Sequence, residues 1–318
     1  MEIPQFLRLF KQTSRNGSWV AITLSKKGVH IAQAKYVGTR PQVTKCSFHP
    51  LTEVTVAELE RIRKEEALET SRFTTLLPAS EYQLFLVEAP NVPVDELKTA
   101  IRWKIKDLLS YHVDDATIDV LKIPANKYGV DRPQSLYAVA AANETVRRRI
   151  ALFEKARIDL KVIDIPEMAQ RNVAALYETE ARGLAFLSFS DEGGLLTVTC
   201  DGELFLARRT DITLGQLQDA DENLRQQYLD RVVLEAQRSL DYFDRQFHHI
   251  PVSRMLVCAP ESLGLDRLLA DSLGLPVEML DLAQGMDIIA VPELLDSEFV
   301  THALPALGAA LRQERRAL

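Results

Sequence analysis

The stretch GLAFLSFSDEGGLLTVTCDGELFLARR, residues 183–209, decides the fold. It predicts three short strands, because apolar and β-branched runs are separated by Asp-Glu-Gly-Gly at 191–194 and by Asp201-Gly202. Asp-Gly between two such runs is a strong hairpin signal, since both central residues of a type I′ turn need positive φ. The stretch therefore predicts two consecutive antiparallel hairpins.

A similar stretch lies near the start of the chain, with turns expected at 25–28 and 38–41 and strands at 19–24, 29–34 and 43–48. Gly28 and Gly194 end the first turn of each stretch and lie 166 positions apart. Gly38 and Gly202 mark the second turns and lie 164 positions apart. The near-constant offset predicts a duplicated unit of two hairpins at the head of each half.

The remainder of each half alternates strands with helices, which predicts an α/β fold with mixed sheets flanked by helices. Further strands are expected at 73–77, 82–87, 116–123, 135–142, 160–165, 254–259 and 276–280. Helices are expected at 55–70, 94–109, 143–156, 166–178, 219–247, 263–273 and 299–312.

Periodicity also predicts which helical side chains point inward. In helix 94–109 the expected inward stripe is Leu97, Ile101, Ile105 and Leu108, and Trp103 is expected to pack on a neighbouring strand. The run Arg147, Arg148 and Arg149 is expected to point outward, after an N-cap at Asn143. The inward stripe of the long helix is expected to begin at Leu224.

Composition excludes several classes of protein. The 318 residues are 47% hydrophobic and 26% charged, which suits an ordinary folded core rather than a disordered chain. The formal net charge of −7 argues against a general nucleic-acid binder. Cys46, Cys200 and Cys258 have no metal-ligand spacing and are interpreted as free thiols in a reducing compartment. With neither a secretory signal nor a long apolar run, we expect a cytoplasmic protein.

The segment 1–17 interleaves apolar and basic residues. It could form an amphipathic helix on an anionic membrane, with peripheral association through residues 1–15, or a short helix folded onto the domain, or a tail. At the other end, the basic-rich run 312–316 would suit a juxtamembrane position if this chain were the cytosolic part of a longer membrane protein.

Taken in order, several segments resemble the PilM-like proteins of type IV pilus systems, in the actin-like ATPase superfamily. They are VVLEAQRSLDYFDRQF at 232–247, RMLVCAP at 254–260, SLGLDRLLADSLGLPVEML at 262–280 and PALGAALR at 305–312. The segment 97–124 is most similar to the MshI group of the MSHA pilus machinery, and the cytoplasmic domain of GspL is similar in fold. The resemblance covers nearly the whole chain after residue 17.

This resemblance implies two actin-like lobes. The first would span 18–180, carry an inserted small subdomain at about 82–142, and be completed by a C-terminal helix at about 299–318. The second would span 181–298. The resemblance also implies a cytoplasmic location under the inner membrane. The expected partners are the cytosolic tail of a PilN-like bitopic protein and other components of the pilus platform.

Some members of this family bind ATP, so the corresponding positions decide whether this chain does. Actin-like folds hold phosphates with a glycine-bearing turn after the first strand of each half, and Mg²⁺ with an acid on each strand. Here the acids of the PilM-like pattern fall on Thr23 and Ser188, and its glycines fall on Ser25 and Ser190. The adenosine-side glycines fall near 257–260, where the chain has none.

Neither acid of the family pattern is present, so we expect a degenerate nucleotide site, no cofactor, no metal and no enzymatic activity. Asp191, Gly193 and Gly194 could still contact phosphate or Mg²⁺ in a shifted register, but an ordinary hairpin turn also favours these residues. The first hypothesis is therefore a non-catalytic scaffold that binds a segment of a membrane partner. The alternative is an actin-like ATPase that binds Mg-ATP and regulates pilus or type II secretion assembly.

Overall fold

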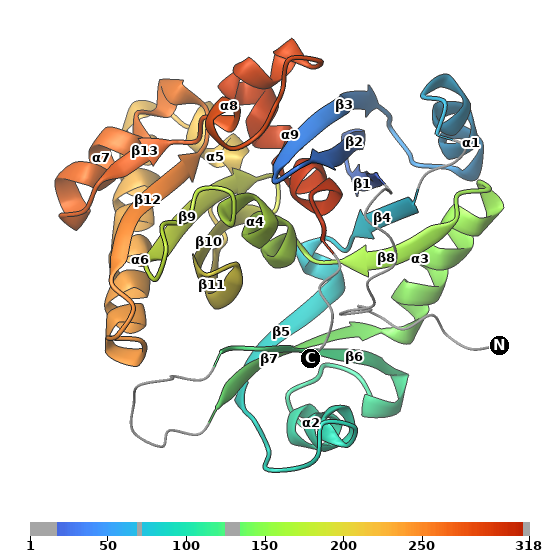
Figure 1. Ribbon diagram of the computed structural model, residues 1–318, viewed down its shortest axis with the longest axis horizontal. Coiled ribbons are helices and arrows are strands. Elements are labelled where there is room, and N and C mark those ends of the chain that lie inside the picture. Colours follow the sequence, from blue (N-terminus) through green and yellow to red (C-terminus); the bar gives the residue numbers. More distant parts are fainter. Residues whose placement is uncertain (1–17, 69–71, 125–133, 314–318) are drawn as a thin grey trace.

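The computed structural model describes residues 18–68, 72–124 and 134–313, and it contains two five-stranded sheets and one three-stranded sheet (Figure 1). The segment 1–17, most of the loop expected at 126–134 and the end of the basic run at 312–316 lie outside the described residues. In the described part of the chain, no helix is long and apolar enough to cross a membrane.

The first sheet has the strand order β3-β2-β1-β4-β8. Its strands are β1 (Trp19–Ser25), β2 (Gly28–Val37), β3 (Arg40–Pro50), β4 (Arg72–Leu76) and β8 (Leu160–Asp164). Two antiparallel hairpins join β1, β2 and β3, and β4 and β8 continue the sheet in parallel with β1.

The second sheet repeats this plan, with the order β11-β10-β9-β12-β13. Its strands are β9 (Gly183–Ser190), β10 (Gly193–Cys200), β11 (Glu203–Thr210), β12 (Val252–Cys258) and β13 (Val277–Met279). Hairpins again join the first three strands, and the last two run parallel to β9. The predicted duplication is therefore present in the strand order of both halves.

The hairpin turns follow the sequence signals, with one correction. Asp201 and Gly202 both have positive φ, 51° and 71°, as the predicted turn requires. In the first turns, Ser25 pairs with Gly28 and Ser190 pairs with Gly193. The residue equivalent to Gly28 is therefore Gly193 and not Gly194, because the second half enters its turn one position earlier than the glycine count implied.

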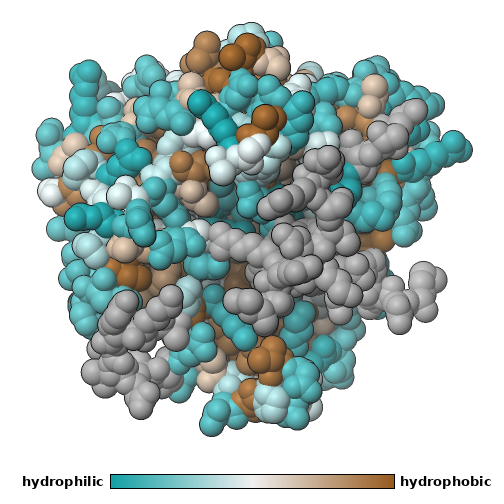
Figure 2. Space-filling view, viewed as in Figure 1, coloured by the Kyte–Doolittle hydropathy of each residue, from teal (hydrophilic) through white to brown (hydrophobic). Residues whose placement is uncertain are grey.

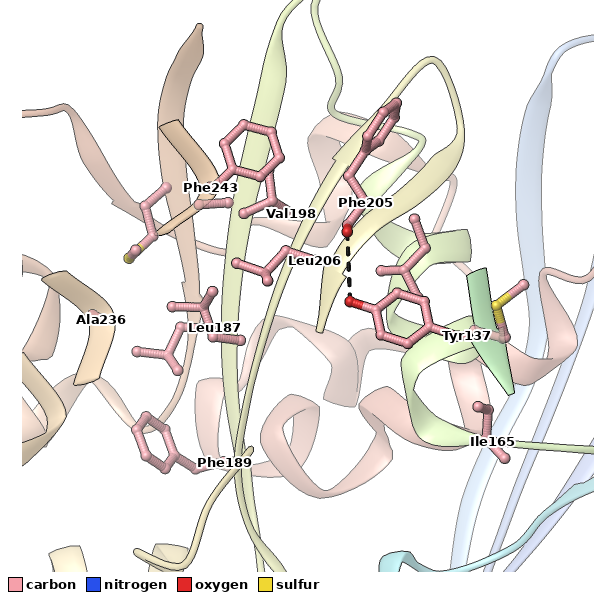
Figure 3. Close-up of a cluster of buried hydrophobic side chains, with 14 of the residues drawn as sticks. Tyr137, Ile165, Leu187, Phe189, Val198, Phe205, Leu206, Ala236 and Phe243 are labelled. Atoms are coloured by element: carbon pink, nitrogen blue, oxygen red, sulfur yellow. Dashed lines mark hydrogen bonds between the residues drawn. The ribbon is translucent and has the colours of Figure 1, made fainter. Parts of the chain in front are cut away.

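The third sheet is small, with the order β5-β7-β6. Its strands are β5 (Tyr82–Glu88), β6 (Ala116–Lys122) and β7 (Ser135–Ala142). Helix α2 packs on one face through a cluster that includes Ile101 and Ile105, and Tyr137 on the opposite face contacts β11. Figure 3 shows Tyr137 pointing at the main chain of Phe205 within the largest core cluster.

Helices cover the sheets, and α9 lies between the two large ones (Figure 1). They are α1 (Val56–Glu65), α2 (Leu97–Ile105), α3 (Asn143–Lys155), α4 (Pro166–Ala174), α5 (Leu214–Asp219), α6 (Glu222–Gln246), α7 (Leu265–Leu273), α8 (Leu282–Gly285) and α9 (Ser297–Ala310). Helix α9 contacts β1, β2 and β4 of the first sheet and β9 and β12 of the second. It also packs tightly on α4, since a Cβ on Gly308 would lie 2.2 Å from the carbonyl oxygen of Ala169.

Several expected side-chain positions were wrong. Arg149 is buried, because it lies three residues after Val146 and four before Phe153 on the inward stripe of α3. Trp103 is 63% exposed, since it lies two positions from Ile101 and therefore on the opposite side of α2. Leu108 is 54% exposed because α2 ends at Ile105.

Two further corrections concern helix starts. Leu224 is 39% exposed, so the inward stripe of α6 begins one turn later, where Tyr228 and Leu229 pack on the core. The N-cap of α3 is Ala142 and not Asn143, whose carboxamide instead bonds Thr117 and the carbonyl of Asp114.

Candidate functional site

A cavity of about 330 Å³ lies between the first hairpins of the two halves. The ends of β1 and β9 form its floor together with the turns that follow them, and α4 and α9 supply further walls. Its lining is mainly apolar and includes Phe48, Leu76, Leu77, Phe299 and Leu304. Such a cavity between lobes is the first place to look for a ligand.

The structure brings six of the positions singled out in the sequence to this one cavity. Thr23, Ser25, Ser188, Ser190, Asp191 and Gly193 all line it. Gly194 does not, and neither does the segment 257–260 at the end of β12, where Pro260 precedes a short 3₁₀ helix.

Ser25 and Ser190 complete their own turns in matching ways. The Ser25 hydroxyl donates to the carbonyl of Gly28 (3.1 Å) and accepts from the amide of Lys27 (3.2 Å). The Ser190 hydroxyl donates to the carbonyl of Gly193 (3.2 Å) and accepts from the amide of Glu192 (3.1 Å). In both turns, the serine hydroxyl therefore accepts a hydrogen bond from a turn amide, and that amide is no longer free to donate to an anion such as phosphate.

Gly28 and Gly193 are required by close strand packing. A Cβ on Gly28 would lie 2.1 Å from the carbonyl oxygen of His49, and a Cβ on Gly193 would lie 2.1 Å from that of Thr210. Both have φ values, 145° and 112°, that other residues rarely adopt. The hairpins alone thus account for these glycines, without an approaching ligand.

A neutral hydrogen-bond network surrounds Ser188, one of the two positions where the sequence analysis looked for an acid. The Ser188 hydroxyl donates to Oε1 of the buried Gln170 (2.5 Å). The Gln170 amide in turn donates to the carbonyl of Phe186 (2.8 Å) and to the Thr197 hydroxyl (2.9 Å). This arrangement supplies no carboxylate for Mg²⁺.

The acids that do line the cavity have partners. Asp191 Oδ1 lies 2.9 Å from Lys27 Nζ, so an ion pair joins the turns of the two halves. Glu192 Oε2 accepts a hydrogen bond from the amide of Ala79 (2.7 Å), at the start of the 3₁₀ helix η1 (Ala79–Glu81). No group of three or more His, Cys, Asp or Glu side chains that could hold a metal occurs among the described residues.

Two histidines line the cavity that the sequence did not single out, His30 on β2 and His302 on α9. Burial, together with the nearby His302, lowers the pKa of His30 to about 4. The His30 ring stacks on Phe48 at 4.4 Å between centroids. His30 is thus neutral at physiological pH and extends the apolar wall.

A buried polar cluster supports the wall at Arg209. Arg209 Nε lies 2.9 Å from Glu167 Oε1, Arg209 Nη2 donates to the Tyr82 hydroxyl (2.6 Å), and that hydroxyl donates to Glu167 Oε2 (2.5 Å). Burial raises the pKa of Tyr82 well above its usual value, and the neighbouring Glu167 carboxylate adds to this. The cluster joins the small sheet, α4 and β11.

Sequence reasoning missed Lys27, His30, His302 and this cluster, because each depends on contacts between segments far apart in the chain. The matching turns did carry one signal, since Lys27 and Glu192 occupy equivalent positions and bear opposite charges.

No known protein family profile matches the chain, and no curated protein sequence matches it. Among solved structures, a chain of the PilM-PilN type IV pilus biogenesis complex is similar, with a TM-score of 0.72 and 19% identity. The similarity covers 94% of this chain and 99% of that chain.

Weaker similarities extend to two further solved structures. The cytoplasmic domain of EpsL, an inner-membrane component of the type II secretion system of Vibrio cholerae, has a TM-score of 0.49 and 12% identity, over 83% of this chain and 86% of that one. A Bacteroides thetaiotaomicron protein with an actin-like ATPase fold and unknown function has a TM-score of 0.49 and 10% identity, over 86% and 94%.

The similarity to the pilus complex chain over 94% of this chain, together with the repeated strand order, confirms the expected α/β fold with duplicated, hairpin-led sheets in its two halves.

Proposed function

We propose that the protein is a non-catalytic scaffold of a type IV pilus assembly platform, of the MSHA type, that binds the cytosolic segment of a PilN-like bitopic inner-membrane protein. The observation that carries the proposal is the similarity to a chain of the PilM-PilN complex, over 94% of this chain and 99% of that one. The proposal places the protein in the cytoplasm, peripheral to the inner membrane, with residues 1–15 as a second attachment.

The geometry of the cavity supports a role without nucleotide. Thr23 and Ser188 stand where the family pattern has acids, and the serine hydroxyls of the two turns satisfy amides that phosphate would need. Asp191, the acid best placed to replace them, is paired with Lys27. The apolar walls favour a ligand with apolar groups over a triphosphate.

Calorimetric titration with the partner's cytosolic segment, made as a synthetic peptide, tests the proposal. We expect saturable binding, and no interaction with any component of the pilus platform would contradict the scaffold role. The partner is to be sought as a short neighbouring gene that encodes one membrane span.

Thermal unfolding with millimolar Mg-ATP tests the alternative ATPase. A ligand that binds the native state must raise the melting temperature, and at 100 times its Kd it adds about 2.7 kcal/mol to the free energy of unfolding. The scaffold role predicts no such binding, so we expect a change below about 1 °C. A rise of several degrees that Asp191→Ala abolishes would instead establish a nucleotide site in altered geometry.

A further inference from the structure

Strand β5 lies at an open edge of the small sheet. It pairs with β7 on one side, in unbroken register from Tyr82–Ala141 to Glu88–Ser135, and no described strand pairs with its other side. An edge strand exposes a row of main-chain donors and acceptors that can pair with another extended segment.

The register fixes which residues of β5 face outward. Ala89 and Gln134 form the next pair of the same register, and the amide of Ala89 donates to the carbonyl of Gln134 at 2.6 Å. Hydrogen-bonded and non-hydrogen-bonded pairs alternate in an antiparallel ladder, so the main chains of Val87 and Phe85 face β7. Those of Leu84, Leu86 and Glu88 therefore face away from it.

An independent contact agrees with this assignment. Lys104 on α2 donates to the carbonyl of Glu88 at 2.8 Å, and so approaches β5 from its outer side. Within the described parts of the chain, no donor or acceptor contacts the main-chain groups of Leu84 or Leu86.

Two other sheet edges are covered. On β3, the amide of Val43 donates to the carbonyl of Asp287, and the amide of Asp287 donates to that of Pro41, both at 2.8 Å. On β11, the hydroxyl of Tyr137 accepts from the amide of Ala207 and donates to the carbonyl of Phe205 (Figure 3). Strand β5 has no such cover among the described residues, and its sequence YQLFLVE contains neither Lys nor Pro, the usual protections of an edge.

Apolar side chains are exposed both on the edge strand and around α2. Leu86 on β5 is 43% exposed, and Val94, Trp103 and Leu108 around α2 are each more than half exposed. Figure 2 shows a patch of apolar residues at the lower end of the molecule, where Figure 1 places α2. Exposed apolar groups of this kind mark interaction surfaces.

We infer that the β5 edge takes an extended segment of a protein partner as a fourth strand of the small sheet. The inference rests on the proposed function, whose partner segment it places. The open stretch from Gln83 to Val87 spans about 17 Å, which suits five residues of extended chain. It is bounded at one end by the 3₁₀ helix η1, which directly precedes Tyr82, and at the other by Lys104, which donates to the carbonyl of Glu88.

The chemistry of the segment follows from the edge. Main-chain pairing supplies the attachment, and apolar side chains at alternate positions lie beside Leu84 and Leu86. Lys104 has no carboxylate partner among the described residues, so a carboxylate on the segment beside Glu88 gains an ion pair. A short single segment fits this bounded stretch better than a second copy of the chain, which would bring its own α2 and β11 into contact.

Two substitutions at one position separate main-chain pairing from side-chain contact. Leu86→Pro and Leu86→Ala both remove the leucine side chain, but only proline also removes the outward amide, with no internal hydrogen bond lost. By calorimetry, we expect the partner segment to bind Leu86→Pro at least tenfold more weakly than Leu86→Ala, and Lys104→Ala several-fold more weakly than wild type. Equal affinities for the two Leu86 variants would overturn the inference.

Hydrogen exchange of the wild-type protein, followed by mass spectrometry over 82–88, needs no variant. One probe is the partner segment, and the other is a blocked heptapeptide of alternating valine and threonine that ends in glutamate. We expect both to slow exchange over 82–88. If only the heptapeptide slows exchange, the edge site stands and the proposed partner is refuted. If the partner segment binds without slowing exchange, the partner stands and the edge site is refuted. If neither peptide slows exchange, the inference is overturned. A dimer in light scattering that Leu86→Pro abolishes would assign the edge to a second copy instead.

Discussion

Lys27 Nζ lies 2.9 Å from Asp191 Oδ1, so one ion pair joins the turns that the duplicated halves direct at each other. Both side chains are well exposed, at 62% and 34% of their surface. Exposed pairs contribute little, because solvent screens them and ordering two side chains costs entropy.

A double-mutant cycle with Lys27→Met and Asp191→Asn measures the coupling energy of this ion pair. In urea unfolding, we expect a coupling below about 1 kcal/mol that decreases as salt is added. An ion pair this weak would let the two hairpin turns separate when a ligand binds. A coupling energy above about 2 kcal/mol between Lys27 and Asp191 would instead mean that the ion pair holds the turns together.

Gly193→Ala should destabilise the protein by about 3 kcal/mol or more, because a Cβ there meets the Thr210 carbonyl oxygen at 2.1 Å. Gly38→Ala is the matched control. Gly38 also has positive φ, 66°, but a Cβ there has no neighbour within 4 Å, so we expect a cost of only about 1 kcal/mol. Equal losses in thermal unfolding would contradict the packing explanation.

His30 should make stability fall as the pH is lowered from about 6.5 to about 4. Its pKa is about 4 in the folded protein and near 6.5 when unfolded, so the unfolded state binds the proton first on acidification. The full effect is up to about 3 kcal/mol, reduced by residual solvent contact.

Asp119 opposes this trend, because burial raises its pKa to about 6 and the folded state then binds a proton that the unfolded state has lost. The useful measurement is therefore the difference between wild type and His30→Gln. We expect the variant to lose less stability than wild type between pH 6.5 and 4, and parallel pH profiles would show that His30 does not contribute.

Arg312 forms a buried ion pair with Asp164, with Nη1 2.5 Å from Oδ2 and side-chain exposures of 9% and 3%. Arg312→Met leaves the Asp164 carboxylate buried without this partner and should cost about 3–5 kcal/mol. Adding Asp164→Asn should recover part of that loss, because the unpaired charge is removed. As a control, Arg61→Met breaks exposed pairs with Glu58 and Glu65 and should leave the free energy of unfolding nearly unchanged, because solvent screens both pairs.

The parts of the fold that were predictable from sequence are those set by local chemistry. Asp201-Gly202 identified its turn because few other residues adopt positive φ twice in succession. The sequence also carries a local signal for α5, the capping box formed by Thr213 and Gln216. This signal was overlooked. Arg149 was misplaced because three arginines were treated as one surface, although successive helical residues turn by about 100°.

The site was only half predictable. Sequence placed Thr23, Ser25, Ser188 and Ser190 at matching points of two hairpins, and the structure brings them to one cavity. The partners that define its chemistry could not be predicted, since Lys27 and Asp191 lie 164 positions apart. The cluster around Glu167 likewise draws on three separate elements.

Helix α9 has a consequence for biosynthesis. It packs on β1, β2 and β4, which leave the ribosome more than 200 residues before it does. Until residues 297–310 emerge, the apolar side chains that β1 and β2 turn toward α9, including Ala21, Ala32 and Ala34, lack their cover. The nascent chain therefore depends on residues 297–310, and ribosome-stalled chains that stop before residue 297 should recruit chaperones that chains extended past residue 310 release.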